Sequence, residues 1–235
     1  MSANPYLANP RWTLAEQVTD AVRRRFSAQV LAIGAHGALA HGDDGDDSDV
    51  NLVVVTYRPG EGPRPATRRV GGVIVDLGVI GADEYLGHAR TLSTGWPLAA
   101  DQYLTTRTTF DPDGWYELLR DTHLSRLAEA GKGEFTALAR EAWYGACSAA
   151  AHARRLATWH DTDAGLVALS DARVGAALVD GLLSRTYFRD GPDAVRRTGL
   201  AGAPMTELTE RLATQAAELA KRGRPVDGEI ADLFS

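Results

Sequence analysis

The sequence predicts an α+β protein, in which an N-terminal mixed sheet with flanking helices is followed by an all-α helical bundle. In the first half, short and nearly continuous apolar runs indicate strands that are buried on both faces. From Trp115 onward the pattern is helical almost to the end of the chain. We therefore expect a domain boundary near residue 127, with an α/β domain over residues 1–127 and a helical domain over residues 128–235.

Local signals define the elements of the first half. Thr13 can cap a helix that begins at Leu14, and two apolar runs on either side of a Gly-rich turn indicate two strands. Gly71 and Gly72 indicate the turn of a later hairpin. The expected helices cover residues 14–26 and 82–89, the expected strands cover residues 29–33, 50–57, 67–70 and 73–79, and a further segment opens at Trp96 and leads into residues 107–110.

The second half begins after a turn of the sequence Asp-Pro-Asp-Gly at residues 111–114. Glycines and aspartates separate its helical segments. We expect helices over residues 115–129, 133–159, 164–188 and 204–221.

Composition excludes several classes of function. The 235 residues carry a formal net charge of -6, and the 25 Lys and Arg are spread along the chain, which argues against a nucleic-acid partner. Cys147 is the single cysteine, so no internal disulfide is expected. No signal peptide and no run long enough to cross a bilayer is visible. We expect a soluble cytoplasmic protein without a membrane partner.

Residues 30–56 carry the chemistry of the N-terminal half. A strand, a Gly-rich turn and an acidic loop lead into a second strand that opens with Asp49 and Asn51. Side chains alternate along a strand, so these two lie on the same face and form a plausible metal-phosphate site. Asp76 lies in a later strand. The spacing of the acidic loop at residues 43–47 is not that of an EF-hand, which favours a solvated turn.

Together these residues resemble the aminoglycoside 4'-nucleotidyltransferase family (kanamycin nucleotidyltransferase), which has the nucleotidyltransferase fold. The resemblance covers nearly the whole chain and is strongest over residues 28–125. The matching residues are Gly34, Gly37, Ala38, Gly45, Ser48, Asp49, Val50, Asn51, Asp76, Gly95, Trp96, Pro97, Leu98, Gln102, Asp111, Gly114, Trp115, Gly181, Leu182 and Arg185. The resemblance implies acids that bind Mg²⁺ and a nucleoside triphosphate, a carboxylate base, and a homodimer.

The chain departs from this pattern at most of the positions that carry nucleotidyl transfer. Ala38 stands for the turn serine, His41 for an arginine, Asn51 for the second acid and Ile74 for a lysine. The resemblance also places Ser148 on the general-base glutamate and His152 on a nearby lysine. Removing one electrostatic contributor typically costs about 10²–10³ in rate, so their joint loss argues against efficient nucleotidyl transfer.

Other titratable residues indicate a replacement chemistry. His36 and His41 lie in the turn before Asp49, and with Asp49 and Asp76 they would suit proton transfer on an organic substrate. The alternative is that both histidines are ordinary residues of a surface turn. On the helix at residues 133–159, four further residues share one face and are expected to line an interdomain cleft. These are Glu141 as a catalytic candidate, and Tyr144, Ser148 and His152 as substrate-binding candidates together with Asn51.

Three functions stay open from the sequence. The first is a repurposed nucleotidyltransferase fold that acts on a small, antibiotic-like specialised metabolite by acid/base chemistry, without NMP transfer and without a cofactor. The second is a Mg²⁺-dependent nucleotidyltransferase acting on an aminoglycoside-like hydroxyl, with Asp49 and Asp76 as metal ligands and an NTP as donor. The third is a non-catalytic protein that binds a small molecule.

Overall fold

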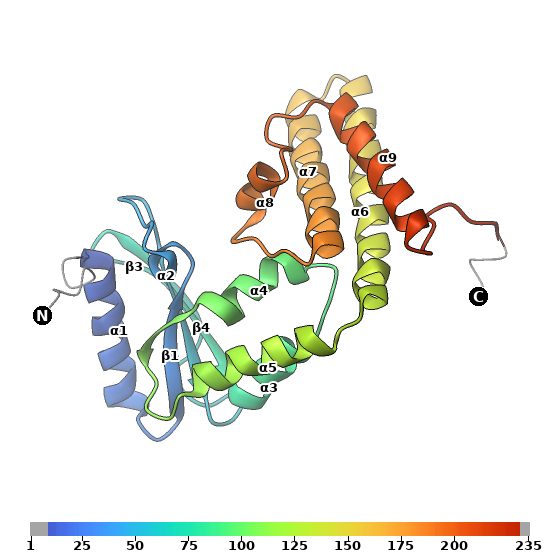
Figure 1. The fold of residues 1–235 in the computed structure, drawn as a ribbon. Coiled ribbons are helices and arrows are strands. Elements are labelled where there is room, and N and C mark those ends of the chain that lie inside the picture. Colours follow the sequence, from blue (N-terminus) through green and yellow to red (C-terminus); the bar gives the residue numbers. More distant parts are fainter. Residues whose placement is uncertain (1–8, 231–235) are drawn as a thin grey trace, which may run out of the picture. The chain divides into compact units, whose positions relative to one another are not determined.

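The computed structural model describes residues 9–230, which form two compact units (Figure 1). One unit contains the chain up to Thr91 together with Asp101–Ala128. The other contains Leu92–Ala100 and the chain from Glu129 onward. The second unit therefore includes a segment, residues 92–100, that the sequence assigns to the N-terminal domain.

A five-stranded mixed sheet forms the centre of the first unit. Its strands lie in the order β3-β4-β2-β1-β5, with β2 parallel to β4 and the other neighbours antiparallel. The sheet and the helical region that follows it confirm the predicted α+β class. The strands are β1 (Val30–His36), β2 (Val50–Thr56), β3 (Ala66–Val70), β4 (Val73–Gly81) and β5 (Arg107–Phe110).

Helices cover both faces of the sheet (Figure 1). Helix α1 (Pro10–Phe26) packs on one face, where Ala15 meets Val50 and Leu52. Helices α3 (Ala82–Arg90) and α5 (Trp115–Glu129) pack on the other. Alternation along β2 explains the division, because residues 50, 52 and 54 point to α1 while residues 51, 53 and 55 point to α3 and α5. Burial of both faces is why the strands are nearly continuous in apolar residues.

The start of α1 differs from the prediction. The N-cap is Asn9, whose side chain accepts hydrogen bonds from the backbone N–H groups of Arg11 and Trp12. Pro10 occupies the first helical position, where its missing N–H costs nothing. The predicted cap, Thr13, lies inside the first turn and donates its hydroxyl to the carbonyl of Asn9 at 3.3 Å.

One close contact fixes α5 against β1. A Cβ added at Gly34 would lie 2.4 Å from Thr106 Cγ2 and 2.7 Å from Tyr116 Cζ, so only glycine fits. The Tyr116 side chain passes beside Gly34, and its hydroxyl donates to the carbonyl of Val53 at 3.0 Å. The Asp111 carboxylate accepts from the first backbone N–H groups of α5 and thereby holds the start of this helix.

The second unit is a bundle with a core rich in alanine. Ala146, Ala150 and Ala176 are among its fully buried residues, and a Cβ at Gly175 would lie 3.0 Å from Ala146 Cβ, so α6 and α7 approach closely. The Trp143 indole donates to the carbonyl of Leu212 and ties α6 to α9. The helices are α6 (Lys132–Thr158), α7 (Thr162–Ser184), α8 (Gly191–Arg197) and α9 (Met205–Lys221); α4 (Trp96–Thr105) begins in this unit and ends in the first.

The short helix α8 has no counterpart in the sequence prediction. Its N-cap is Asp190, and the buried Asp193 ties its roughly two turns together by accepting from Arg196 and Arg197. Within residues 9–230, no helix combines the length and the apolar character needed to cross a bilayer.

We expect Gly34→Ala to destabilise the first unit. The added methyl group would overlap the ring of Tyr116, and overpacking of a filled core typically costs about 1–3 kcal/mol. Gly87→Ala in α3 is the matched control, because a Cβ there meets nothing within 4 Å. Urea unfolding should separate the two variants; equal stability would contradict the packing described for Gly34.

Candidate functional site

The site lies on the sheet face that α3 and α5 cover. Strand pairing places His36 opposite Asn51, Asn51 opposite Asp76, and Asp76 opposite Thr67. Paired residues in neighbouring strands share a face, so these four side chains form one polar row across β1, β2, β4 and β3. Strands lie about 4.8 Å apart, which places the backbones of His36 and Asp76 roughly 10 Å from each other. The row is the arrangement that the sequence predicts for Asn51 and Asp76.

Residues of the row form hydrogen bonds with both predicted acids, Asp49 and Asp76. The Asn51 amide donates from Nδ2 to Asp49 Oδ1 at 3.0 Å, and the Thr67 hydroxyl donates to Asp76 Oδ1. Asp49 is exposed, whereas Asn51 and Asp76 are half-buried. The amide at position 51 therefore acts as a hydrogen-bond donor to its neighbouring carboxylate.

His36 contributes the imidazole of the row. Burial lowers the pKa of its imidazole below the usual 6.5, and the negative charges of Asp76, Asp49 and Asp101 oppose this shift without cancelling it. The side chain is consequently neutral at pH 7 and can accept a proton. The nearby carboxylates would stabilise the imidazolium that results.

His41 has a different partner from the one the sequence suggests. It ends the short helix α2 (Ala38–His41), and its Nε2 lies 3.0 and 3.1 Å from the two carboxylate oxygens of Asp101. Asp101 is 5% exposed. The turn before α2 requires glycine at position 37, where φ is +71° and a Cβ would lie 3.4 Å from Asn51 Nδ2. The turn therefore presents a His41–Asp101 pair beside the row.

Asp101 was missed by the sequence interpretation. The sequence does contain one indication of its role, because Asp101 directly follows the apolar run Trp-Pro-Leu-Ala-Ala at residues 96–100. Aspartate is seldom fully buried unless it is paired. Its partner lies 60 residues away in sequence, so the pair could not be assigned from spacing.

The acidic loop before Asp49 is held by the start of α1. The Asn9 amide donates to both oxygens of Asp44 at 2.9 Å. Arg11 donates from Nε to the carbonyl of Ser48 at 2.8 Å and from Nη2 to the carbonyl of Asp46. In the part of the chain from residue 9 to residue 230, no group of three or more His, Cys, Asp or Glu side chains is arranged to hold a metal ion. The loop thus positions Asp49 through bonds within the protein.

The predicted residues of the helical half lie in the second unit. Glu141, Tyr144, Ser148 and His152 are all exposed along α6. The Tyr144 hydroxyl donates to the carbonyl of Val226 at 2.9 Å, and His152 Nδ1 lies 3.2 Å from Arg155 Nη2. Their assignment to substrate stays a prediction, and the site built from contacts consists of the row, Asp49 and the His41–Asp101 pair.

The donors of this site do not fit a Mg²⁺-bound triphosphate. Asp49 and Asp76 supply two carboxylates, but the amide between them directs its N–H group at Asp49. A triphosphate also needs cations to balance its charge. The turn offers His41 against the carboxylate of Asp101, which adds no positive charge in excess. The arrangement is suited to moving protons rather than to neutralising phosphates.

Comparison with known proteins finds similarity among solved structures. No protein-family model matches the chain, and no curated protein sequence matches it. The crystal structure of a nucleotidyltransferase-like protein from Exiguobacterium sibiricum 255-15 is similar, with a TM-score of 0.46 and 16% identity over 88% of this chain and 77% of that chain.

The titration of His36 tests the electrostatics of the row. We expect NMR to give a pKa for His36 below 6.5, because burial dominates. Asp76→Asn should lower this pKa further, since the Asp76 charge raises it. The folded wild-type protein binds a proton at His36 less tightly than the unfolded chain does. The free energy of unfolding should therefore decrease as the pH falls below about 6.5. A pKa at or above 6.5 would contradict the neutral imidazole.

Proposed function

We propose that this protein is a nucleotidyltransferase-fold enzyme repurposed for acid/base chemistry on a small specialised metabolite, without transfer of an NMP group. The observation that carries the proposal is the neutral imidazole of His36. His36 is paired across the sheet with Asn51, which is paired with Asp76, and the charges of three carboxylates act on the pKa of His36. The fold name and the antibiotic-like substrate class come from the sequence resemblance. The chemistry comes from the site.

The proposed step is a proton transfer. His36 takes a proton from a substrate atom, and the electron pair of the broken bond stays on the substrate. The charges of Asp76 and Asp49 stabilise the imidazolium. The imidazolium then returns the proton at a second atom, or the substrate loses a leaving group. Isomerisation, cyclisation and elimination all follow this scheme, and none of them requires a nucleotide.

The charges of the site argue against the nucleotidyl-transfer alternative. The site holds three carboxylates, Asp49, Asp76 and Asp101, and the four residues of the row include no Lys or Arg. A nucleoside triphosphate would add further negative charge beside these carboxylates. Two Asp side chains on neighbouring elements do favour a cation in principle, and this keeps the alternative testable.

Calorimetric titration separates the two functions. We expect no binding of Mg²⁺ with ATP, GTP, CTP or UTP, whether or not kanamycin is present, because the site lacks compensating cations. Binding of a Mg·NTP complex at about micromolar Kd would overturn the proposal and favour nucleotidyl transfer.

A substrate-independent assay tests the base. Removal of one carbon-bound proton from 5-nitrobenzisoxazole breaks its N–O bond and releases a coloured phenolate, so the reaction reports a general base. We expect the protein-dependent rate to rise with pH to a plateau, with a midpoint below 6.5, as His36 loses its proton. His36→Asn should lower the rate by about tenfold or more.

The control for this assay is His160→Asn. His160 is exposed, and its φ of +58° is a conformation that asparagine tolerates. This variant should keep the wild-type rate. If His36→Asn retains the wild-type rate, or if both variants lose it equally, His36 is not the base.

A further inference from the structure

The pair formed by His41 and Asp101 has a defined geometry. Nε2 of His41 lies 3.1 Å from Oδ1 and 3.0 Å from Oδ2 of Asp101. The Asp101 side chain is 7% exposed, and the His41 side chain is 15% exposed. The carboxylate is therefore more enclosed than the imidazole, which keeps some contact with solvent.

The pairing determines which ring nitrogen of His41 can exchange a proton. An ionised carboxylate accepts hydrogen bonds and donates none, so Nε2 carries a hydrogen in both the neutral and the protonated ring. Within the described part of the chain, no group is bonded to Nδ1 of His41. A proton that His41 gives or takes therefore passes through Nδ1. An aspartate fixes the tautomer of the catalytic histidine in serine proteases in a similar way.

The turn after β1 places His41 beside the polar row. The His41 backbone N–H donates to the carbonyl of Gly37 at 3.2 Å, and Gly37 directly follows His36. A Cβ at Gly37 would lie 3.4 Å from Asn51 Nδ2, so the turn itself contacts the row. The two imidazoles therefore start from backbone positions that belong to one turn.

Asp101 acts on both imidazoles, but in different ways. It is bonded to His41, whereas it acts on His36 through its charge, which raises the His36 pKa against the larger effect of burial. Among residues 9–230, no carboxylate lies within hydrogen-bond distance of the His36 ring. Burial thus keeps His36 neutral, while a bonded carboxylate balances the charged form of His41. Titratable groups in such different surroundings are suited to opposite roles in acid/base catalysis.

Holding the short helix α2 in place does not account for the pair. Leu39 and Ala40 are buried, and the Gly42 N–H closes the helix by bonding to the carbonyls of Ala38 and Leu39. Replacing a buried ion pair by apolar residues of similar size is often neutral or stabilising, so an apolar pair would serve a structural purpose as well. A titratable pair at this place therefore points to chemistry.

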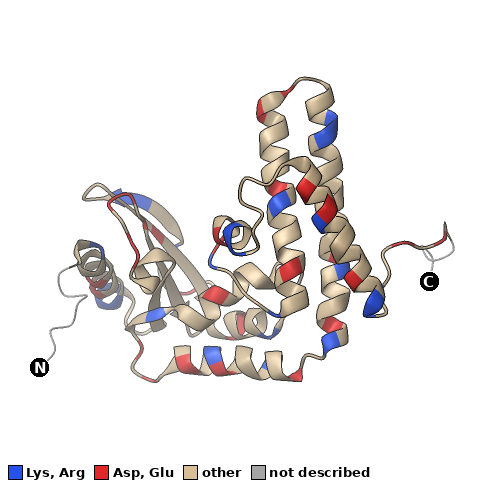
Figure 2. Cartoon of the chain, turned by 45° about the horizontal axis from the view of Figure 1, so that its top comes forward, with Lys and Arg blue, Asp and Glu red and all other residues tan. Residues whose placement is uncertain are grey.

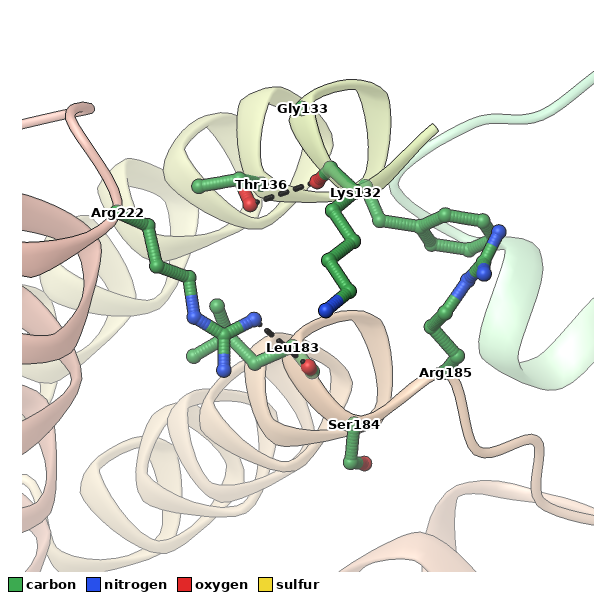
Figure 3. A pocket seen from close by; sticks show the side chains of 8 residues that line it. Lys132, Gly133, Thr136, Leu183, Ser184, Arg185 and Arg222 are labelled. Carbon is green, nitrogen blue, oxygen red and sulfur yellow. Dashed lines mark hydrogen bonds between the residues drawn. The ribbon is translucent and has the colours of Figure 1, made fainter. Parts of the chain in front are cut away.

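The largest set of cations around a cavity of the second unit shows a different use of charge. This cavity of about 560 Å³ is lined by Lys132, Arg185 and Arg222 (Figure 3). Arg222 is paired with Glu218 at 2.8 Å, and Arg185 donates to the carbonyl of Ala130. Acidic and basic residues are also interspersed along α6, α7 and α9 (Figure 2). Structural contacts thus take up charge in this unit, whereas Nδ1 of His41 faces no such partner.

From this geometry we propose that the His41–Asp101 pair is the general acid of the site, and that the substrate carries a poor oxygen leaving group, such as a hydroxyl β to a carbonyl. The proposal rests on the proposed function of His36 as the base, and it selects elimination among the reactions that the site could perform. A poor leaving group departs readily only when it is protonated, which is a task for a second imidazole.

The proposed step balances in protons and electrons. His36 takes the proton from the carbon next to the carbonyl, and the electrons of that C–H bond form the C=C bond. The C–O bond breaks, and its electron pair stays on the oxygen, which takes the proton from Nδ1 of His41. The products are an unsaturated carbonyl compound and water, and proton exchange with solvent restores both histidines. Asp101 stays ionised and acts as a positioning residue.

Two benzisoxazoles test this role of His41. In 5-nitrobenzisoxazole the nitro group stabilises the phenolate that leaves, so its oxygen needs little help from an acid. Unsubstituted benzisoxazole loses the same proton but has a poorer oxygen leaving group. The ratio of the nitro rate to the unsubstituted rate should therefore rise by about tenfold or more in His41→Asn, because general acids typically contribute at least about 10² in rate. A purely structural role would lower both rates and leave their ratio in place.

Asp101→Asn tests the positioning residue. Asparagine keeps the shape of the side chain but removes the carboxylate that holds the hydrogen on Nε2 of His41. The rate ratio should rise in this variant as well, by about tenfold. His160→Asn is the control, because His160 is exposed and lies in the second unit, and it should keep the wild-type ratio. Circular dichroism checks that each variant is folded.

NMR on the wild-type protein tests the pair without a substitution. Long-range ¹H–¹⁵N spectra distinguish the two neutral tautomers of histidine. The neutral ring of His41 should carry its hydrogen on Nε2, and Nδ1 should be free of hydrogen. A neutral ring with the hydrogen on Nδ1 would overturn the proposal even if the variants of the pair do not fold.

Failure of this proposal can be told apart from failure of the proposed function. If His36→Asn keeps the wild-type rate on 5-nitrobenzisoxazole, the base is wrong and both proposals fall. If that rate drops in His36→Asn but the rate ratio is unchanged in His41→Asn, the base stands and the general acid is overturned. An equal rise of the ratio in His160→Asn would also overturn the assignment to His41.

Discussion

The register of three neighbouring strands determines which side chains of this protein can act together. Because β1, β2 and β4 are paired without a shift over their polar ends, His36, Asn51 and Asp76 come to the same face in one row. A slip of one residue in any of the three strands would turn its member of the row toward α1. The contact of Tyr116 with Gly34 protects this register, since it lies on β1 two residues before His36.

The fold could be predicted well because its signals are local. The apolar runs at residues 50–57 and 73–79 and the helical periodicity after Trp115 correspond to β2, β4 and the bundle helices. Strand alternation was also enough to place Asp49 and Asn51 on the same side, where the Asn51 amide donates to the Asp49 carboxylate. The helix start at Pro10 was missed because Thr13 offered a competing cap signal, and α8 was missed because it has only seven residues.

The sites were harder to predict because they depend on contacts between distant segments. Asp101 reaches His41 only because the sheet and α4 bring two segments 60 residues apart together. Lys132, Arg185 and Arg222 lie at three helix ends, and the sequence could not show that they line one cavity. Composition describes the average charge of a chain, whereas recognition depends on the charge that packing gathers at one point.

The hydrogen bonds between the start of α1 and the acidic loop couple the order of these two segments. Asn9 and Arg11 hold the segment that carries Asp49, so the loop and the first turn of α1 form a single opening unit. Fraying of that turn would release the loop and lengthen the reach of Asp49, while the strands behind it stay paired. Amide protons of the loop should therefore exchange with solvent at the rate set by the end of a helix more than 30 residues earlier in the sequence.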